Sequence, residues 1–161
     1  MSSRIVLIAS DHAGYNLKEH LITILPKLNA QPVDLGCAKG EQVDYTLYAA
    51  TLAQKIQCGE APLGILICGT GIGMSIAANK FRGIRAALCH DTFSARAARE
   101  HNDSNILCLG ERVIGSGLAA DIAAAWLNSS FQGGRHLVRV NHITAFEERW
   151  QPASKSGDIN D

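Results

Sequence analysis

Short apolar runs alternate along the chain with longer segments in which apolar residues recur every three or four positions. Five runs are rich in Ile, Val and Leu and too continuous for one-face exposure: 4–10, 32–36, 63–68, 84–89 and 105–110. Such runs are typical of strands that are buried on both faces of a parallel sheet. The pattern therefore predicts five buried parallel strands.

A segment with helical periodicity follows each predicted strand. The first of these carries Leu17, Leu21, Ile24, Leu25 and Leu28, and the later ones cover 47–56, 72–79, 93–100 and 118–127. Five strand–helix units indicate an α/β fold, a three-layer α/β/α sandwich around a five-stranded, parallel, Rossmann-like sheet with right-handed crossovers. A last, C-terminal helix is predicted over 138–150.

Length and composition favour one domain. At 161 residues and 47% hydrophobic content, the chain can bury a substantial core within the usual size of a single domain. We predict one domain over residues 1–150 and a flexible polar tail, QPASKSGDIND, over 151–161.

The charges of the chain balance, with 15 Lys and Arg against 15 Asp and Glu. No global positive field draws such a chain to nucleic acid or to an anionic membrane, so we expect neither as a partner. No segment approaches the roughly 20 apolar residues that span a bilayer, and the N-terminal apolar run is too short for a secretory signal. The five cysteines, without C-x2-C pairing, favour free thiols and a cytoplasmic location.

Polar motifs follow four of the predicted strands: SDHAG after the first, CGTGIG after the third, HDT after the fourth and GER after the fifth. In an open parallel sheet, functional residues gather beyond the carboxyl ends of the strands. The loop 69–73 also places backbone N–H groups at a helix N-terminus, where they favour a negative charge. The sequence therefore predicts an anion site at this edge.

Three interpretations of this loop compete, and the sequence argues against two of them. A dinucleotide loop normally follows the first strand rather than the third, and no second domain remains for a hydride acceptor. A phosphatase of the C-x5-R type needs arginine six residues after Cys68, where Met74 stands. The third interpretation is an oxyanion that forms on a substrate, with Cys68 as acid or base. A thiol at a helix N-terminus ionises more readily, which suits proton transfer at pH 7.

Six motifs together resemble the ribose-5-phosphate isomerase B family, which is shared with allose- and galactose-6-phosphate isomerases. They are SDHAG (10–14), DY (44–45), ICGTGIGMSIAANK (67–80), IRAALC (84–89), HNDSNILCLGER (101–112) and GGRHLVRV (133–140). Their order and spacing agree over nearly all of residues 4–148. The resemblance implies that an aldose phosphate is converted to its ketose through a cis-enediolate, without a metal or cofactor.

The resemblance also implies the residues that move the proton. Cys68 takes the role of the base between C1 and C2. The hole for the enediolate oxygen would be formed by Thr70 with the amides of Gly69, Gly71 and Gly73. Some relatives use a glutamate of the following helix as base, but Ser75 stands in that helix here, which indicates the cysteine variant and leaves Ser75 as a substrate contact.

Further roles concern the sugar. By resemblance, His101 opens the furanose ring, Asn102 and Tyr45 hold hydroxyl groups, and Asp11 contacts the sugar and relays protons. Taken alone, Asp11 is equally a helix cap, and His101 with Asn102 is an ordinary helix C-terminus. The family commonly has proline after the tyrosine of DY, whereas this chain has Thr46, which leaves the placement of Tyr45 open.

By the same resemblance, the phosphate would be held by His12, Arg112, Arg135 and Arg139. Guanidinium groups suit phosphate oxygens. Arg135 and Arg139 are four positions apart and share one face if their segment is helical. We therefore predict an isomerase of D-ribose 5-phosphate and D-ribulose 5-phosphate in the non-oxidative pentose phosphate pathway. The alternatives are a hexose 6-phosphate isomerase, a non-catalytic partner chain and a nucleotide-binding regulatory module.

The predicted topology separates the site residues into two groups. Cys68 ends a strand, whereas His101 follows the fourth helix at the opposite edge of the sheet, a separation of five strand residues at roughly 3.3 Å each. A residue there serves a neighbouring chain more easily than its own. We predict a homodimer whose sites combine Cys68 of one chain with His101 of the other, with a tetramer of such dimers as an alternative.

Overall fold

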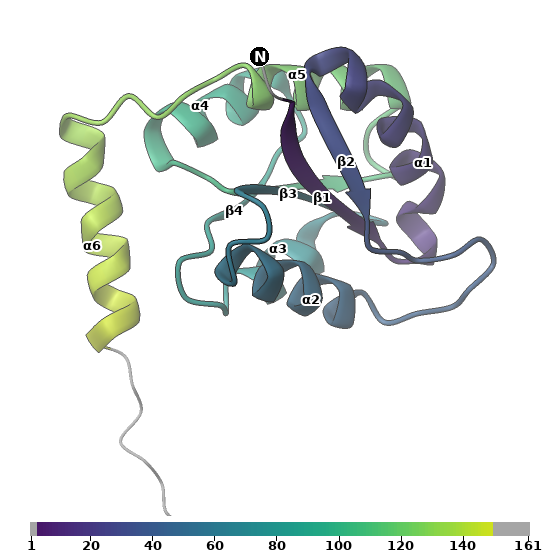
Figure 1. Cartoon of the computed structure of the whole chain (residues 1–161), viewed down its shortest axis with the longest axis horizontal. Helices are drawn as coiled ribbons and strands as arrows, with labels where there is room; N and C mark the ends of the chain where they lie inside the picture. The colour runs from purple at the N-terminus through teal and green to yellow at the C-terminus, as the bar shows by residue number, and fades with distance from the viewer. Residues whose placement is uncertain (1–2, 150–161) are drawn as a thin grey trace, which may run out of the picture.

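Five parallel strands lie between two layers of helices in the computed structural model, which describes residues 3–149 (Figure 1). The strands are β1 (Arg4–Ser10), β2 (Ala30–Asp34), β3 (Leu63–Cys68), β4 (Ala86–Leu88) and β5 (Ile106–Gly110). Their spatial order is β2-β1-β3-β5-β4, and each neighbouring pair is parallel. The predicted fold class is confirmed.

Six α-helices connect or follow the strands: α1 (Tyr15–Ile24), α2 (Tyr45–Gln57), α3 (Ile72–Ala78), α4 (Thr92–Asn102), α5 (Ser116–Leu127) and α6 (Arg135–Arg149). Two short 3-10 helices, η1 (His12–Gly14) and η2 (Leu25–Leu28), flank α1. No helix within residues 3–149 is both long and apolar enough to cross a membrane.

The two helical layers enclose two separate cores. Helices α1, α4 and α5 cover one face of the sheet, and α2 and α3 cover the other (Figure 1). Because strand side chains alternate in direction, Ile65 and Ile67 of β3 enter the first core, while Leu66 and Cys68 enter the second. Cys68 therefore ends its strand on the side that α3 covers.

Burial on both faces holds for the central strands and fails for the two edge strands. β3 and β5 are buried throughout. β2 lies at 30–34 rather than at the predicted 32–36, and only Ala30 in it is buried. β4 covers 86–88 rather than 84–89 and is half-buried. An edge strand has a neighbour on one side only, so its apolar run overstates its burial.

Helix boundaries differ from prediction where a local feature intervenes. The first helical segment divides because Pro26 has no amide hydrogen, so α1 ends at Ile24 and the chain tightens into η2. α4 continues to Asn102 rather than ending at 100, so His101 belongs to the helix and not to the loop after it.

Helix α6 begins at Arg135 rather than at the predicted 138. Its predicted end at 150 and the predicted tail over 151–161 lie outside the described residues. α6 stands away from the sheet, and its main packing partner is α4 (Figure 1). Four of its large apolar side chains are exposed: Leu137, Val138, Ile143 and Phe146.

Candidate active site

A cleft of about 440 Å³ opens at the carboxyl ends of β1, β3 and β5. Ala13, Ile72 and eight of the predicted site residues line it: Asp11, His12, Tyr45, Cys68, Gly69, Thr70, Gly73 and Arg112. The fold thus brings together segments from three loops and from the start of α2. Each of these segments follows a strand or opens a helix at the same edge of the sheet.

Cys68 is the last residue of β3 and is 6% exposed. The backbone N–H of Gly71 donates to its Sγ at 3.1 Å, which fixes the direction of the sulfur at the mouth of the cleft. Gly71 has a φ of 76°, and an added Cβ would lie 2.5 Å from the Leu88 side chain and 2.9 Å from the Leu109 backbone. Only glycine therefore allows this loop to turn back over the sulfur.

The first turn of α3 faces the cleft without a side-chain cap. The nearest hydroxyl, that of Thr70, lies 3.4 Å from the amide nitrogen of Ile72, which is long for a hydrogen bond. The amides of this turn are therefore open to a substrate oxygen. Ser75 is not among the lining residues, because its hydroxyl turns back and donates to the Ile72 carbonyl at 2.8 Å.

Asp11 caps a helix and also lies in the cleft, which are the two places that the sequence allowed for it. Its Oδ1 accepts hydrogen bonds from the amides of Ala13 at 2.9 Å and Gly14 at 3.0 Å, which confirms that it caps a helix, here η1. The same side chain is 7% exposed and lines the cleft. The cap fixes the direction of the carboxylate and leaves it beside a bound substrate.

Glu111 ties the loop after β5 to α1. Its Oε2 accepts from the Leu17 amide at 2.9 Å, and its Oε1 accepts from Asn16 Nδ2 at 3.0 Å. The next residue, Arg112, donates from its amide to the Gly69 carbonyl at 3.0 Å. Its guanidinium lies against the same glycine, 3.4 Å from where an added Cβ would be. Sequence analysis gave Glu111 no role. Its place in the GER motif was the one signal that could have identified it.

Thr46, which stands where the resemblance predicts proline, takes part in the cap of α2 beside Tyr45. Asp44 caps the helix by accepting from the Thr46 amide at 2.8 Å and from its hydroxyl at 2.7 Å. These two bonds lower the pKa of the Asp44 carboxyl, the backbone bond most. The Tyr45 ring then lies over Gly73, where an added Cβ would come within 2.6 Å of it. Tyr45 therefore reaches the cleft.

Four further residues lie away from this cleft, namely those predicted to open the furanose ring, to hold a hydroxyl group or to bind the phosphate from the C-terminal helix. His101 and Asn102 end α4, and Arg135 and Arg139 belong to the first turns of α6. The rings of His101 and His136 are stacked, with centroids 4.2 Å apart and planes 6° apart. The structure thus forms a second group of predicted site residues, at the junction of α4 and α6.

Within one chain, the first group lies at the carboxyl ends of the strands and the second group lies near their amino ends. α4 runs back from the carboxyl end of β4, so His101 lies near the amino ends of the strands. The loop after α4 confirms this, because the Asn105 carbonyl accepts from the amide of Gly64, near the start of β3. Cys68 ends the same six-residue strand, a length of about 20 Å. One chain does not bring Cys68 and His101 together.

His136 is the residue of the second group that sequence analysis missed. The motif GGRH contained it, but no spacing assigned it a partner. Its side chain is 9% exposed. Burial lowers its pKa below the ordinary value, and the nearby charges of His101, Arg135 and Arg139 lower it further. A neutral ring is therefore held against His101 near pH 7.

We expect His136 to make the fold sensitive to mild acid. The unfolded chain binds a proton at the ordinary pKa of histidine, whereas the folded chain binds it only at lower pH. Stability should therefore fall as the pH falls from the ordinary value through the lowered one. Urea unfolding at pH 7.5 and 5.5 measures this loss. The variant His136→Phe keeps an aromatic ring against His101 and should lose less stability over the interval. An equal loss in both proteins would contradict the prediction.

Comparison with known proteins identifies the class to which this fold and cleft belong. Residues 6–143 match the family described as Ribose/Galactose Isomerase, and the chain belongs to that family.

Among individual relatives, ribose-5-phosphate isomerase B of Escherichia coli is 46% identical over 144 residues, 89% of this chain and 97% of the relative. A Bacillus subtilis protein named as a sugar phosphate isomerase is 54% identical over 145 residues, again 89% and 97%. The structure of ribose-5-phosphate isomerase B from Clostridium thermocellum superposes with a TM-score of 0.89 at 49% identity, over 91% of this chain and 99% of that one.

Proposed function

We propose that this protein interconverts D-ribose 5-phosphate and D-ribulose 5-phosphate through a cis-enediolate, in the non-oxidative pentose phosphate pathway. The observation that carries the proposal is the cleft in which Cys68, with an amide directed at its sulfur, lies beside the uncapped start of α3. The names of the Escherichia coli and Clostridium thermocellum relatives support the pentose substrate.

The residues of the cleft divide the chemistry between them. Cys68 removes the proton from C2 of the open-chain aldose and returns it to C1. Negative charge then develops on the substrate oxygen, where the Thr70 hydroxyl and the amides of the loop 69–73, other than the Gly71 amide that bonds Cys68, stabilise it. His12 and Arg112 bind the phosphate from the loops after β1 and β5. Asp11 and Tyr45 hold the sugar hydroxyls.

Two chains complete each site in this proposal. His101 and Asn102 of one chain act at the cleft of its partner, and Arg135 and Arg139 reach the same phosphate from α6. The strand length of about 20 Å between the two groups supports this arrangement. An isologous contact creates two equivalent sites at once. A tetramer built from two such dimers is the alternative assembly.

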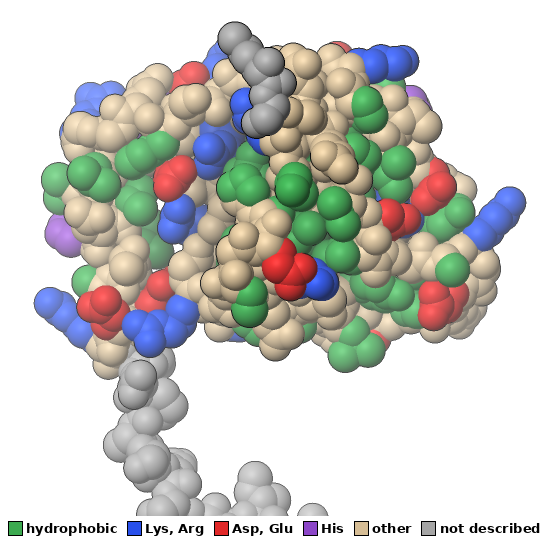
Figure 2. All heavy atoms as spheres, in the orientation of Figure 1, with side chains coloured by type: hydrophobic (Ala, Val, Ile, Leu, Met, Phe, Trp, Pro, Cys, Tyr) green, Lys and Arg blue, Asp and Glu red, His purple; other side chains and the backbone are tan. Residues whose placement is uncertain are grey.

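Helix α6 gives independent support for an assembled state. Its exposed apolar residues and the groove of about 440 Å³ beneath it leave apolar surface that a partner chain would bury (Figure 2). Ile143 and Phe146 line this groove from the helix side. All five cysteines are free thiols, which suits the reducing cytoplasm that we propose as the location.

Turnover of three sugar phosphates tests the assignment. We expect D-ribose 5-phosphate to be converted with a higher kcat/KM than allose 6-phosphate or galactose 6-phosphate. Coupled assays at matched concentrations measure all three. Comparable or better turnover of a hexose phosphate would assign the chain to the hexose branch of the family. Binding of AMP or NAD without turnover of any sugar phosphate would favour a regulatory module instead.

A further inference from the structure

Two arginines converge on Asp103, the residue that follows His101 and Asn102. Arg85 donates from Nη2 to Oδ2 at 2.8 Å, and Arg99 donates from Nη1 to Oδ1 at 3.0 Å. The side chains of Asp103, Arg85 and Arg99 are only 34%, 20% and 15% exposed. Each carboxylate oxygen therefore holds a different guanidinium in a partly desolvated cluster, where ion pairs are stronger than on an open surface.

The same arginines bind the backbone at the end of α4. Arg85 donates from Nε to the carbonyls of Asn102 at 3.1 Å and Asp103 at 2.8 Å. Arg99 also donates from Nη1 to the Ser104 carbonyl at 2.6 Å. Asn102 is the last residue of α4, and its carbonyl lacks a partner within the helix, while Asp103 and Ser104 follow directly, so these bonds hold the end of the final turn. That turn carries His101.

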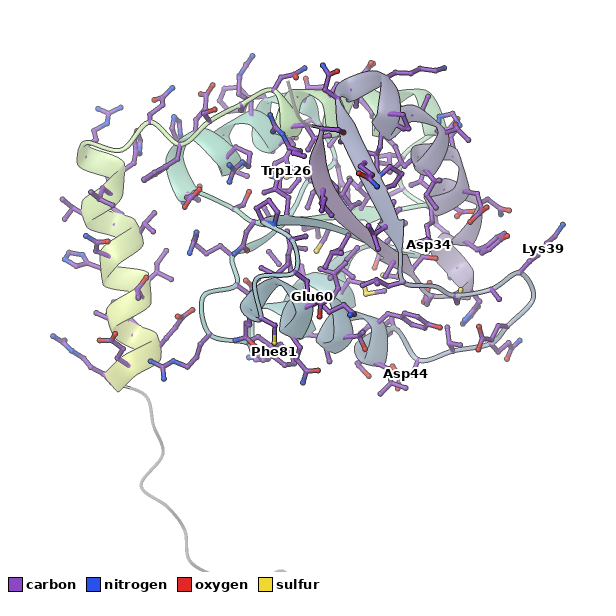
Figure 3. All side chains as sticks on the ribbon, viewed as in Figure 1. Asp34, Lys39, Asp44, Glu60, Phe81 and Trp126 are labelled. Atoms are coloured by element: carbon purple, nitrogen blue, oxygen red, sulfur yellow. The ribbon has the colours of Figure 1, made fainter. Side chains whose placement is uncertain are left out.

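The cluster is anchored in the core on the other side. Ser104 is 1% exposed, and its Oγ accepts from Nε1 of Trp126 at 2.8 Å. Trp126 is fully buried among the side chains of the α4 and α5 layer (Figure 3). The guanidinium of Arg99 lies 5.7 Å from the centroid of the same indole. Ser104 and Arg99 are therefore held on the core side, and a change at Asp103 moves the end of α4 instead.

We infer that Asp103 is a positioning residue that fixes His101 and Asn102 at the end of α4 by holding Arg85 and Arg99. It does so at a left-handed φ of 47°, where the helix stops and the chain turns toward β5. The inference rests on the proposed function, because Asp103 acts through the ring-opening role of His101. The stacked ring of His136 holds His101 from the α6 side, and the cluster holds the backbone beneath it.

Loss of the carboxylate has a specific consequence. Two guanidinium groups are left facing each other without their shared counter-charge, and Nε of Arg99 already lacks a hydrogen-bond partner in the described part of the chain. Arg85 is then drawn away from the Asn102 carbonyl that it holds. The last turn of α4 shifts, whereas the cleft around Cys68, at the other edge of the sheet, does not.

Two variants separate the carboxylate from the backbone conformation. Asp103→Asn keeps the shape and tolerates the left-handed conformation, and Asp103→Gly adopts it freely with no side chain. The matched control is Glu60→Gln, which removes the 2.7 Å ion pair with Lys55 on the α2 side of the sheet (Figure 3). If Asp103→Gly does not fold, Asp103→Asn and Arg85→Lys serve in its place, because lysine keeps the charge and loses the bonds from Nε.

The measurement compares two phases of the reaction with D-ribose 5-phosphate. A small open-chain fraction reacts in the pre-steady state without ring opening, and the bulk furanose must first be opened. In the Asp103 variants we expect steady-state turnover to fall about 100-fold, the cost that a displacement of about 1 Å can have, while the open-chain fraction, which needs only the hydroxyl contact of Asn102 from this turn, loses much less. Glu60→Gln should change neither phase.

His101→Asn, assayed alongside, distinguishes the two ways in which the inference can fail. A selective loss of furanose turnover in His101→Asn but not in the Asp103 variants would overturn the positioning role alone. No selective loss in His101→Asn would overturn its ring-opening role, and the positioning role with it. An equal fall of both phases in the Asp103 variants would mean that Asp103 only supports the fold.

Discussion

Replacement of Cys68 by alanine is expected to lower kcat for isomerisation by about 10² to 10⁴-fold, the range for loss of a general base. The affinity for a substrate analogue that carries the phosphate should remain near that of the wild type, because in the proposed mechanism His12 and Arg112 bind the phosphate from other loops. Turnover and calorimetric binding, measured on the same preparation, test both halves of the prediction.

Serine at the same position distinguishes the proton-transfer role from a packing role. Cys68→Ser keeps the size and can still accept the bond from the Gly71 amide, but an alcohol is a far weaker acid than a thiol. The serine variant should therefore be nearly as slow as the alanine variant. If Cys68→Ser retained most of the wild-type turnover, Cys68 would be a packing residue and another group would move the proton.

Cys89→Ala is the matched control. Cys89 is 2% exposed, and burial raises its pKa to about 11, so its thiol is neutral at pH 7. Burial also raises the pKa of Cys108 well above its ordinary value. Neither thiol can act as a base at neutral pH, and Cys89→Ala should lose some stability while keeping its turnover.

Most of the first group of site residues could be placed from sequence, because their position follows from chain order, whereas the placement of Tyr45 stayed open. A parallel sheet places the carboxyl ends of its strands on the same side, so motifs that follow neighbouring central strands meet there. The cleft contains residues from SDHAG, CGTGIG and GER for this reason. HDT, which follows the edge strand β4, is not among the residues that line the cleft. Helical periodicity likewise predicted six helices, because the spacing of apolar residues along the chain is enough to identify them without knowledge of tertiary contacts.

The strand order and the element boundaries could not be predicted in the same way. Apolar runs do not show which strands lie at an edge, so β2 and β4 were expected to be as buried as β3. α4 extends to Asn102, whose carbonyl accepts a bond from Arg85, a residue that precedes the helix. Thr46 departs from the family pattern, and only its two bonds to Asp44 show that the start of α2 is nevertheless capped. Each of these features depends on contacts between particular side chains.

Mixing two inactive variants is expected to restore activity if the sites are shared between chains. Cys68→Ala and His101→Ala should each be nearly inactive as homodimers. In a mixed dimer, one cleft lacks both groups, and the other combines Cys68 of one chain with His101 of its partner. With statistical exchange half of the dimers are mixed, so about a quarter of all sites should regain function.

The recovered activity must follow subunit exchange rather than simple mixing. Native mass spectrometry gives the fraction of mixed dimers, and turnover should rise in proportion to it. A chain that carries both substitutions, mixed with wild type under the same conditions, is the control, because each mixed dimer then has two defective clefts and gains nothing. Confirmed exchange without recovery would place Cys68 and His101 in one chain, which would require α4 to reach across the full length of β3 to its own cleft.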